Sequence, residues 1–414
     1  MKNLPNILKP AIIATPFILL NMPIAHANDL TTALTSGKAS GNLRLRFEDV
    51  DQDNGLKDAS ALTLRSRIGY ETGSVSGFSA KIEVEDNRVV AGQDDYSVPS
   101  FGVAGNGHNV GEYSVIADPE TTEVDQAYLQ YSQNGLSAKL GRQVITLDNH
   151  RFVGHVGWRQ DRQVFDAFTV NYKASDTLKF SYGYISEREG IFAEDRDMDA
   201  KDHLANVNYK SGLGALTGYA YLLETDTSGS DAAIDTYGLR FSGSKMADKT
   251  KILYTLEYAT QEWSMEDSNL EYDADYMFAE LGAVINGVTI KAGYEVLGSD
   301  DGDYGFATPL ATLHKFNGWT DQFLNTGSLG LVDAMLTVST KIGKGKLAVI
   351  YHDFSPDEDS ATVSDLGTEW NAVYTMKFGK NYKAGIKYAN YSAGDSAAGK
   401  VDTDKLWIWG ELSF

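Results

Sequence analysis

The sequence of 414 residues contains no cysteine and only 8 prolines. Disulfide bonds therefore cannot stabilise it, so its stability must come from its size or from a sheet that closes on itself. A long hydrophobic run is also missing after Leu20, since no later segment reaches the roughly eighteen apolar residues of a membrane-spanning helix. These absences argue against a disulfide scaffold and against a bundle of membrane helices.

The first 27 residues have the order of a secretory signal peptide. Two lysines precede an apolar run from Ala11 to Leu20, and a small-x-small site follows at Ala25-His26-Ala27. The run is too short to span a bilayer and Pro16 interrupts it, which argues against a signal anchor. We therefore predict a cleaved signal peptide over residues 1–27 and a single domain over residues 28–414. Such an exported chain is a soluble protein or a β-barrel, whose membrane signal is weak in each strand.

The mature sequence repeats one unit, a run of alternating apolar and polar residues that ends in a short turn or a long loop. Short turns such as Gln133-Asn134-Gly135 and Gly343-Lys344-Gly345 have hairpin chemistry. Short and long connections alternate, which places all short turns at one end of the sheet and all long loops at the other. The pattern predicts an all-β fold, a transmembrane antiparallel β-barrel of about 18 strands with short periplasmic turns and long extracellular loops.

The last ten residues, 405–414, show how the predicted sheet closes. Every second side chain is apolar or glycine up to Phe414, while the other face carries tryptophans and polar residues. An edge strand of a soluble sandwich is the alternative reading. Open edges cannot lie in hydrocarbon, however, so we expect this segment to pair with the strand near residues 38–50.

Charge is divided unequally between the loops and the predicted lumen. The formal net charge is -21, and much of the acid lies in long loops. Alternation places a basic majority on the inward face: Arg44, Arg46, Arg65, Arg67, Lys81, Lys179, Arg240, Lys251, Lys291, Lys341, Lys377, Lys383 and Lys387. A pore lined by arginine and lysine concentrates anions. The alternative is that these charges pair with nearby carboxylates and stiffen the wall.

Two loops, 91–120 and 299–330, are long enough that one or both can fold into the lumen as a constriction. We expect no cofactor, no metal and no catalytic residue. His150 and His155 lack companion ligands for a metal site, and the sequence has no G-x-S-x-G elbow that would indicate a serine nucleophile.

One stretch carries a resemblance to a known family. It reads Gly141-Arg142-Gln143, then His150-Arg151-Phe152-Val153-Gly154, Trp158-Arg159-Gln160 and Phe165-Asp166-Ala167-Phe168. This pattern resembles the alginate-export type of outer-membrane porin, specifically over 122–172 and in general organisation over 38–414. The resemblance implies an eighteen-stranded barrel whose basic, constricted lumen passes anionic polyuronates or similar oligosaccharides. The matching candidates are Arg142, Arg151, Arg159 and Arg162.

Arg142 is ambiguous from the residues themselves. Strict alternation from Leu136, Ala138 and Leu140 turns Arg142 toward lipid, unless a bulge at Gly141 resets the register.

We therefore expect an outer-membrane porin for the passive diffusion of small hydrophilic anions or oligosaccharides, located in the outer membrane of a Gram-negative bacterium. The alternatives are a general non-specific porin, a structural or adhesive barrel and, less well supported, a barrel enzyme. The expected partners are outer-membrane lipids, lipopolysaccharide and the barrel assembly machinery, which reads a terminal signal resembling Leu412 and Phe414. No nucleic-acid partner is expected.

Overall fold

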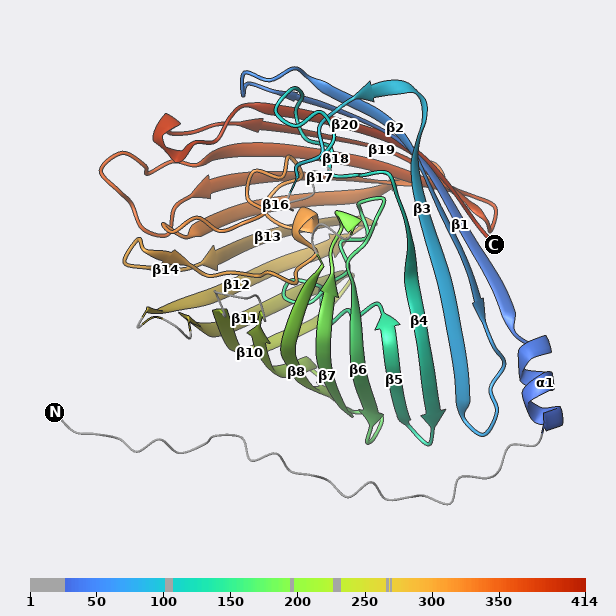
Figure 1. The fold of residues 1–414 in the computed structure, drawn as a ribbon. Helices are drawn as coiled ribbons and strands as arrows, with labels where there is room; N and C mark the ends of the chain where they lie inside the picture. Colours follow the sequence, from blue (N-terminus) through green and yellow to red (C-terminus); the bar gives the residue numbers. More distant parts are fainter. Residues whose placement is uncertain (1–26, 101–106, 194–196, 226–231, 266–267, 269) are drawn as a thin grey trace.

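The computed structural model describes residues 27–100, 107–193, 197–225, 232–265, 268 and 270–414. Its main element is an 18-stranded antiparallel sheet. The first strand, β1 (Lys38–Gln52), pairs with β2 (Ala59–Glu71) on one side and with the last strand, β20 (Thr403–Ser413), on the other. The sheet is therefore a closed barrel (Figure 1), and the predicted pairing of the two terminal strands is confirmed.

The remaining wall strands follow one another in chain order, each paired with its sequence neighbours. They are β3 (Phe78–Asp95), β4 (Thr121–Gln133), β5 (Leu136–Gln143), β6 (Val164–Lys173), β7 (Leu178–Glu189), β8 (Met198–Ser211), β9 (Gly214–Glu224), β10 (Ala232–Ala247), β11 (Thr250–Met265), β12 (Glu271–Ile285), β13 (Val288–Leu297), β16 (Leu331–Ile342), β17 (Gly345–Ser355), β18 (Gly367–Phe378) and β19 (Tyr382–Ser392). A small hairpin, β14 (Ser299–Asp300) with β15 (Tyr304–Gly305), forms a separate two-stranded sheet and is not part of the barrel wall.

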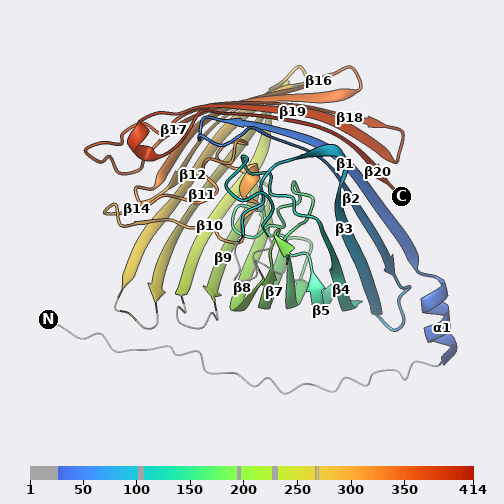
Figure 2. The same ribbon diagram turned by 45° about the horizontal axis from the view of Figure 1, so that its top comes forward.

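Short turns gather at one end of the barrel and long connections at the other (Figure 2). Helix α1 (Ala27–Thr35) and the C-terminus lie at the short-turn end. This end is periplasmic in an outer-membrane barrel, and the long loops are extracellular. The predicted signal peptide falls almost entirely on residues 1–26, which lie outside the described residues, so it stays a prediction. Within the described ranges, no helix is long and apolar enough to cross a membrane.

The outer face of the wall is an apolar belt. Large hydrophobic side chains on it stay exposed, for example Ile68 at 64%, Leu140 at 62% and Leu281 at 65%. They alternate with buried or polar inward residues, since successive side chains in a strand point to opposite faces. Contiguous exposed hydrophobic surface of this extent fits contact with lipid.

Three long connections reach into the lumen: the described parts of the β3–β4 loop (96–100 and 107–120), the β5–β6 loop (144–163) and the β13–β16 segment (298–330). Strand β3 continues to Asp95, so the first loop begins later than predicted. The described part of the β3–β4 loop packs Tyr96, Val98 and Ile116 against the inner wall of β1 and β2. The other two connections supply Val153, Phe306 and Leu310 to the largest buried cluster. The hydrophobic core therefore lies inside the barrel.

Candidate functional site

The predicted arginine ladder of β1 and β2 lies beneath the β5–β6 loop. Arg44 Nε donates to Gln160 Oε1 at 2.8 Å, and Arg44 Nη1 donates to the Gly157 carbonyl at 3.1 Å. Arg46 donates to the Trp158 carbonyl and to Asp118. Both arginines are buried. Both side chains face the lumen, as alternation predicts. Their guanidinium N–H groups, however, donate to protein atoms and hold the β5–β6 loop against the wall.

Arg65 and Arg67 are buried in the same way. Arg65 donates to Asn42, and Arg67 donates to Glu85 and to the Gln160 carbonyl. The contacts of these four arginines therefore fit the alternative hypothesis, in which inward charges pair with other groups and stiffen the wall.

Arg159 joins the wall to two inward connections. Its Nη1 donates to both carboxylate oxygens of Glu48 at 3.0 Å, and its Nη2 donates to Asp321 Oδ2 at 2.9 Å. Lys405 Nζ also reaches Asp321 Oδ2 at 2.9 Å. Burial disfavours the charged form of each group, but the attraction between the opposite charges is the larger effect. The pKa of Arg159 is therefore raised, and the pKa of Asp321 is lowered well below its usual value.

Arg162 and Lys81 share one carboxylate on the opposite side of the same loop. Arg162 donates to Asp125 Oδ1 at 2.7 Å and to Glu83 Oε1 at 2.8 Å. Lys81 lies 3.1 Å from Glu83. The loop is thus pinned by ion pairs at both Arg159 and Arg162.

Arg151 and Arg240 are held by acids of more distant strands. Arg151 Nε donates to Glu295 Oε1 at 2.8 Å and Nη2 donates to Asn317 Oδ1 at 3.1 Å, which ties the β5–β6 loop to the β13–β16 segment. Burial lowers the pKa of Arg151, but Glu295 outweighs it and the net shift is upward. Arg240 pairs with Glu257 across β10 and β11.

Arg142 is the predicted pore residue that the structure does not bring into the lumen. The pairing of β5 has no register shift at Gly141, so Arg142 shares the outward face with Leu140. Its guanidinium donates to Asp166 Oδ1 at 3.0 Å and also to Glu189. The alternation rule was therefore right, and the pore-lining assignment of Arg142 is wrong.

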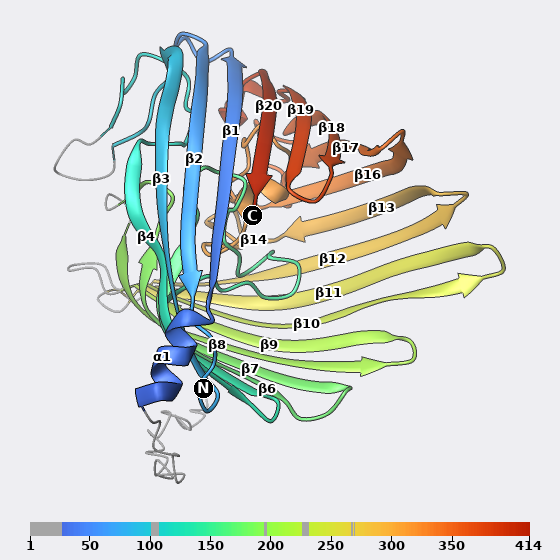
Figure 3. The same ribbon diagram turned by 90° about the vertical axis from the view of Figure 1, so that its right-hand side faces the viewer.

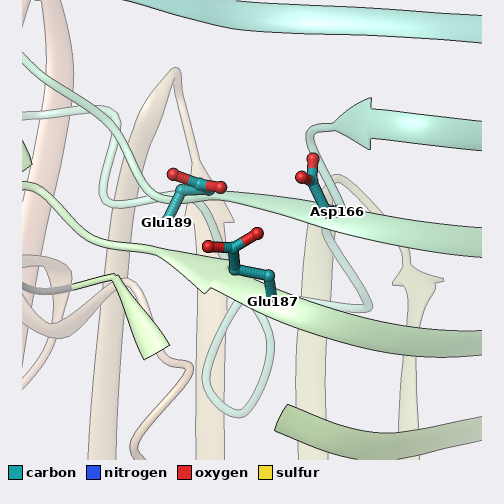
Figure 4. Close-up of side chains that lie close together, drawn as sticks. All are labelled: Asp166, Glu187 and Glu189. Carbon is teal, nitrogen blue, oxygen red and sulfur yellow. The ribbon is translucent and has the colours of Figure 1, made fainter. Parts of the chain in front are cut away.

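The carboxylates around Arg142 form the one group, among the described residues, with spacing suited to a metal ion. Oxygens of Asp166, Glu187 and Glu189 all lie within 4.8 Å of one another. Figure 4 shows these side chains close together at the ends of β6 and β7. Because Arg142 already pairs with two of them, the guanidinium supplies the positive charge that such a cluster requires.

A lysine in an aromatic cage connects the inward segments to the last strands. Lys387 Nζ lies 4.2 Å from the Trp158 ring centre, 4.0 Å from Trp319 and 4.9 Å from Trp407. It also donates to His314 Nε2 at 2.6 Å. The two tryptophans from inward connections and one from β20 thus surround a single ammonium group through cation–π contacts.

A cavity of about 510 Å³ lies above these contacts, at the extracellular side of the inward segments. Arg159, Arg188 and Lys405 contribute positive charge to its lining, and Asp321 contributes negative charge. Val156, Leu310 and other apolar side chains complete it. The cavity therefore combines an apolar lining with basic groups that also pair with carboxylates, Arg159 with Glu48 and Asp321, Arg188 with Asp202.

A group of lysines in the periplasmic half of the lumen has a different environment from the arginine ladder. Cross-strand pairs put Lys341 opposite Lys346, and Lys377 opposite Lys383. Among the described residues, none of these four has a carboxylate within salt-bridge distance. The full set, which we call the periplasmic lysine ring, is Lys139, Lys173, Lys179, Lys210, Lys251, Lys291, Lys341, Lys346, Lys377 and Lys383, and most of its members are exposed.

The inward acids of the same half are few, namely Glu71, Glu280 and Glu411. Alternation predicts that several ring lysines face the lumen, but the predicted site does not include them. Directly opposed like charges destabilise a sheet, and here the charges face water. The signal that could have singled them out is the lysine that recurs near most of the short turns.

Acid is expected to loosen the inward segments. Burial, with nearby cations, lowers the pKa of His155 to about 4 and that of His314 to about 3. An unfolded histidine binds its proton near pH 6.5, so between about pH 6.5 and these lowered values the unfolded segment binds more protons. Packing is therefore strongest at neutral pH and weakens on acidification. Conductance recorded in planar bilayers should therefore become larger and noisier below about pH 5.

The histidine contribution has a matched variant. His155→Asn keeps an acceptor for the Gly157 N–H, which His155 Nδ1 accepts at 3.2 Å, but cannot gain a charge. The variant should show a smaller acid-induced rise in conductance than the parent. Equal acid sensitivity of the two proteins would argue against this explanation.

The closed wall, its apolar belt and the polar lumen narrowed by inward loops define an outer-membrane channel of a Gram-negative bacterium. The chain belongs to the Alginate export family, whose model matches residues 36–296. The resemblance first noted in residues 122–172 is thereby confirmed. Curated protein sequences include no significant match to the chain.

Solved outer-membrane proteins share the fold at low sequence identity. Pseudomonas aeruginosa OpdK, solved with vanillate, aligns with a TM-score of 0.70 and 12% identity over 92% of this chain and 99% of its own. P. aeruginosa OccK11 (OpdR) aligns with a TM-score of 0.66 and 14% identity, over 92% of this chain and 97% of its own. Acinetobacter baumannii OccAB4 aligns with a TM-score of 0.65 and 13% identity, over 91% of this chain and 98% of its own. The 18-stranded barrel is therefore a known architecture.

Proposed function

We propose that this channel allows the passive diffusion of small hydrophilic anions, including acidic oligosaccharides. The observation that carries the proposal is the periplasmic lysine ring. Its members face the lumen, most are exposed, and Lys341, Lys346, Lys377 and Lys383 have no carboxylate partner among the described residues. Rings of lysine favour anions in a pore because low-dielectric walls focus their field.

The extracellular cavity supports a preference for organic anions over simple ions. Its volume of about 510 Å³ lies within the range of small-molecule sites, roughly 300–1,000 Å³. Arg159 and Lys405, which also pair with Asp321, lie there beside apolar side chains, a combination that suits a solute with a carboxylate and an apolar body. Vanillate, bound by OpdK, is an anion of this kind, and uronate oligomers are the extended equivalent suggested by the family.

Diffusion accounts for the inner residues better than catalysis does. The buried histidines have partners other than a hydroxyl nucleophile: His314 contacts Asp321 and Lys387, and His352 contacts Asp333. A hydrolase of the serine type requires a base positioned on its nucleophile. A general, non-specific porin is the closest alternative.

Two partners follow from the location of the protein. The acidic extracellular rim, with Asp357, Glu358 and Asp359 in one loop, suits contact with the cation-bridged lipopolysaccharide layer. The exposed terminal Phe414, on the outward face of the closing strand, suits recognition by the barrel assembly machinery.

The reversal potential of the purified protein in a planar bilayer under a KCl gradient tests the proposal. A potential displaced toward that of chloride is expected. A displacement toward potassium, or the absence of stable conductance, would contradict an anion channel. No displacement in either direction would favour the non-specific porin.

A further inference from the structure

We propose that helix α1 lies in the periplasmic interface of the outer membrane, where the groove between the helix and the barrel wall holds an acyl chain of a phospholipid. The helix lies beside β1 to β3 at the short-turn end of the wall (Figures 1 and 3). It is therefore placed at the membrane level where the apolar belt ends.

The helix is fastened to the outer side of the wall. The Gly73 N–H donates to the Ala33 carbonyl at 2.9 Å, and the Tyr70 hydroxyl donates to the Leu34 carbonyl. Tyr70 alternates along β2 with the inward Arg67, so it faces lipid. Ala33 is 6% exposed against this surface. These contacts hold the C-terminal turn of α1 directly below the belt.

An apolar groove of about 420 Å³ separates α1 from the wall. Leu30 and Leu34 line it from the helix, and Phe78, Ala80 and Leu129 line it from β3 and β4. Leu129 is 50% exposed and belongs to the apolar belt. The groove is thus continuous with the surface that contacts lipid elsewhere on the barrel, and the acyl chains that cover the belt can extend into it.

The exposed residues of α1 are divided in the way that an interfacial helix requires. Leu30 and Leu34, four residues apart, share one side and are 57% and 53% exposed. Thr31 and Thr35 lie on the side facing away from Ala33. The helix contains no lysine or arginine, so its hydrogen bonds to the wall and apolar burial, rather than attraction to anionic headgroups, hold it in place. Amphipathic helices lie in the membrane plane in this way.

The absence of native cysteine makes the test direct. Leu30→Cys and Leu34→Cys each receive a fluorescent label, with Thr35→Cys as the control on the side facing away from Ala33. Each full-length variant is reconstituted in phosphatidylethanolamine and phosphatidylglycerol vesicles with or without brominated acyl chains. Heat-modifiable electrophoretic mobility first verifies that each barrel has folded.

Labels at positions 30 and 34 should be quenched several-fold more by brominated lipid than the label at position 35, and less by aqueous iodide. Equal iodide quenching at all three positions would overturn the proposal, because the helix would then lie in water. Protection of positions 30 and 34 from both quenchers would also overturn it, since a second copy of the chain would then cover the groove.

Discussion

Replacing Arg159 with alanine is expected to give a larger and noisier conductance from a barrel that still folds. The guanidinium bonds Glu48 of β1 and Asp321 of the β13–β16 segment, and all three side chains are almost fully buried. Removing one partner leaves buried carboxylates without their counter-charge. Breaking a buried ion pair in this way costs about 3–5 kcal/mol, which is large compared with the free energy that holds a loop in its packed position.

The cost should fall on the inward segments and leave the wall intact. Wall strands are held by continuous backbone ladders, such as β1 with β2 and β1 with β20, in which Arg159 has no part. At about 1.4 kcal/mol for each factor of ten, a loss of 3 kcal/mol raises the open population of the β5–β6 loop roughly a hundredfold. Single-channel recording and limited proteolysis of this loop measure the change, and heat-modifiable mobility monitors the wall.

Lys57→Ala is the matched control for Arg159→Ala. Lys57 lies 2.6 Å from Glu112, but both side chains are largely exposed, at 61% and 50%. Exposed pairs contribute little to stability, so conductance and proteolysis should stay at parental values. If Arg159→Ala behaves like this control, the buried pairs do not hold the inward segments.

The wall could be predicted from the sequence because its information is local. Alternation with a period of two identifies the outward and inward faces of each strand, and turn residues mark the strand ends. The same rule placed Arg142 outward, and the resemblance to a family motif was the poorer guide to its side chain. The closing strand was predictable for the same reason.

The packing of the inward loops in the lumen could not be predicted, because it depends on contacts between residues far apart in the sequence. Gln160 lies 116 residues from Arg44, and Glu295 lies 144 residues from Arg151. Parity shows that an arginine faces inward, but not that a loop covers it. The arginines therefore looked like pore-lining groups, whereas the structure makes them the supports of the constriction.

Replacing Lys341, Lys346, Lys377 and Lys383 with glutamine is expected to abolish most of the anion preference. Lys341 faces Lys346 and Lys377 faces Lys383 across neighbouring strands, so the variant removes a concentrated region of positive charge near the periplasmic mouth. It also removes two repulsive cross-strand pairs, so the barrel should fold at least as well as the parent. The reversal potential under a KCl gradient should move most of the way to zero.

The quadruple lysine-to-arginine variant is the matched control, because it changes the same side chains and keeps their charge. It should retain the parental reversal potential. If glutamine and arginine variants behave alike, the periplasmic lysine ring does not set selectivity.

Salt dependence separates the lysine ring from the arginine ladder as the origin of selectivity. The screening length falls from about 10 Å at 0.1 M salt to about 3 Å at 1 M, and exposed charges feel this change far more than buried ones. The ring is mostly exposed, whereas Arg46 is 0% exposed and lies against Asp118. Anion preference due to the ring should therefore fall steeply between these salt concentrations. A preference that persists at 1 M salt would instead assign selectivity to the buried arginines.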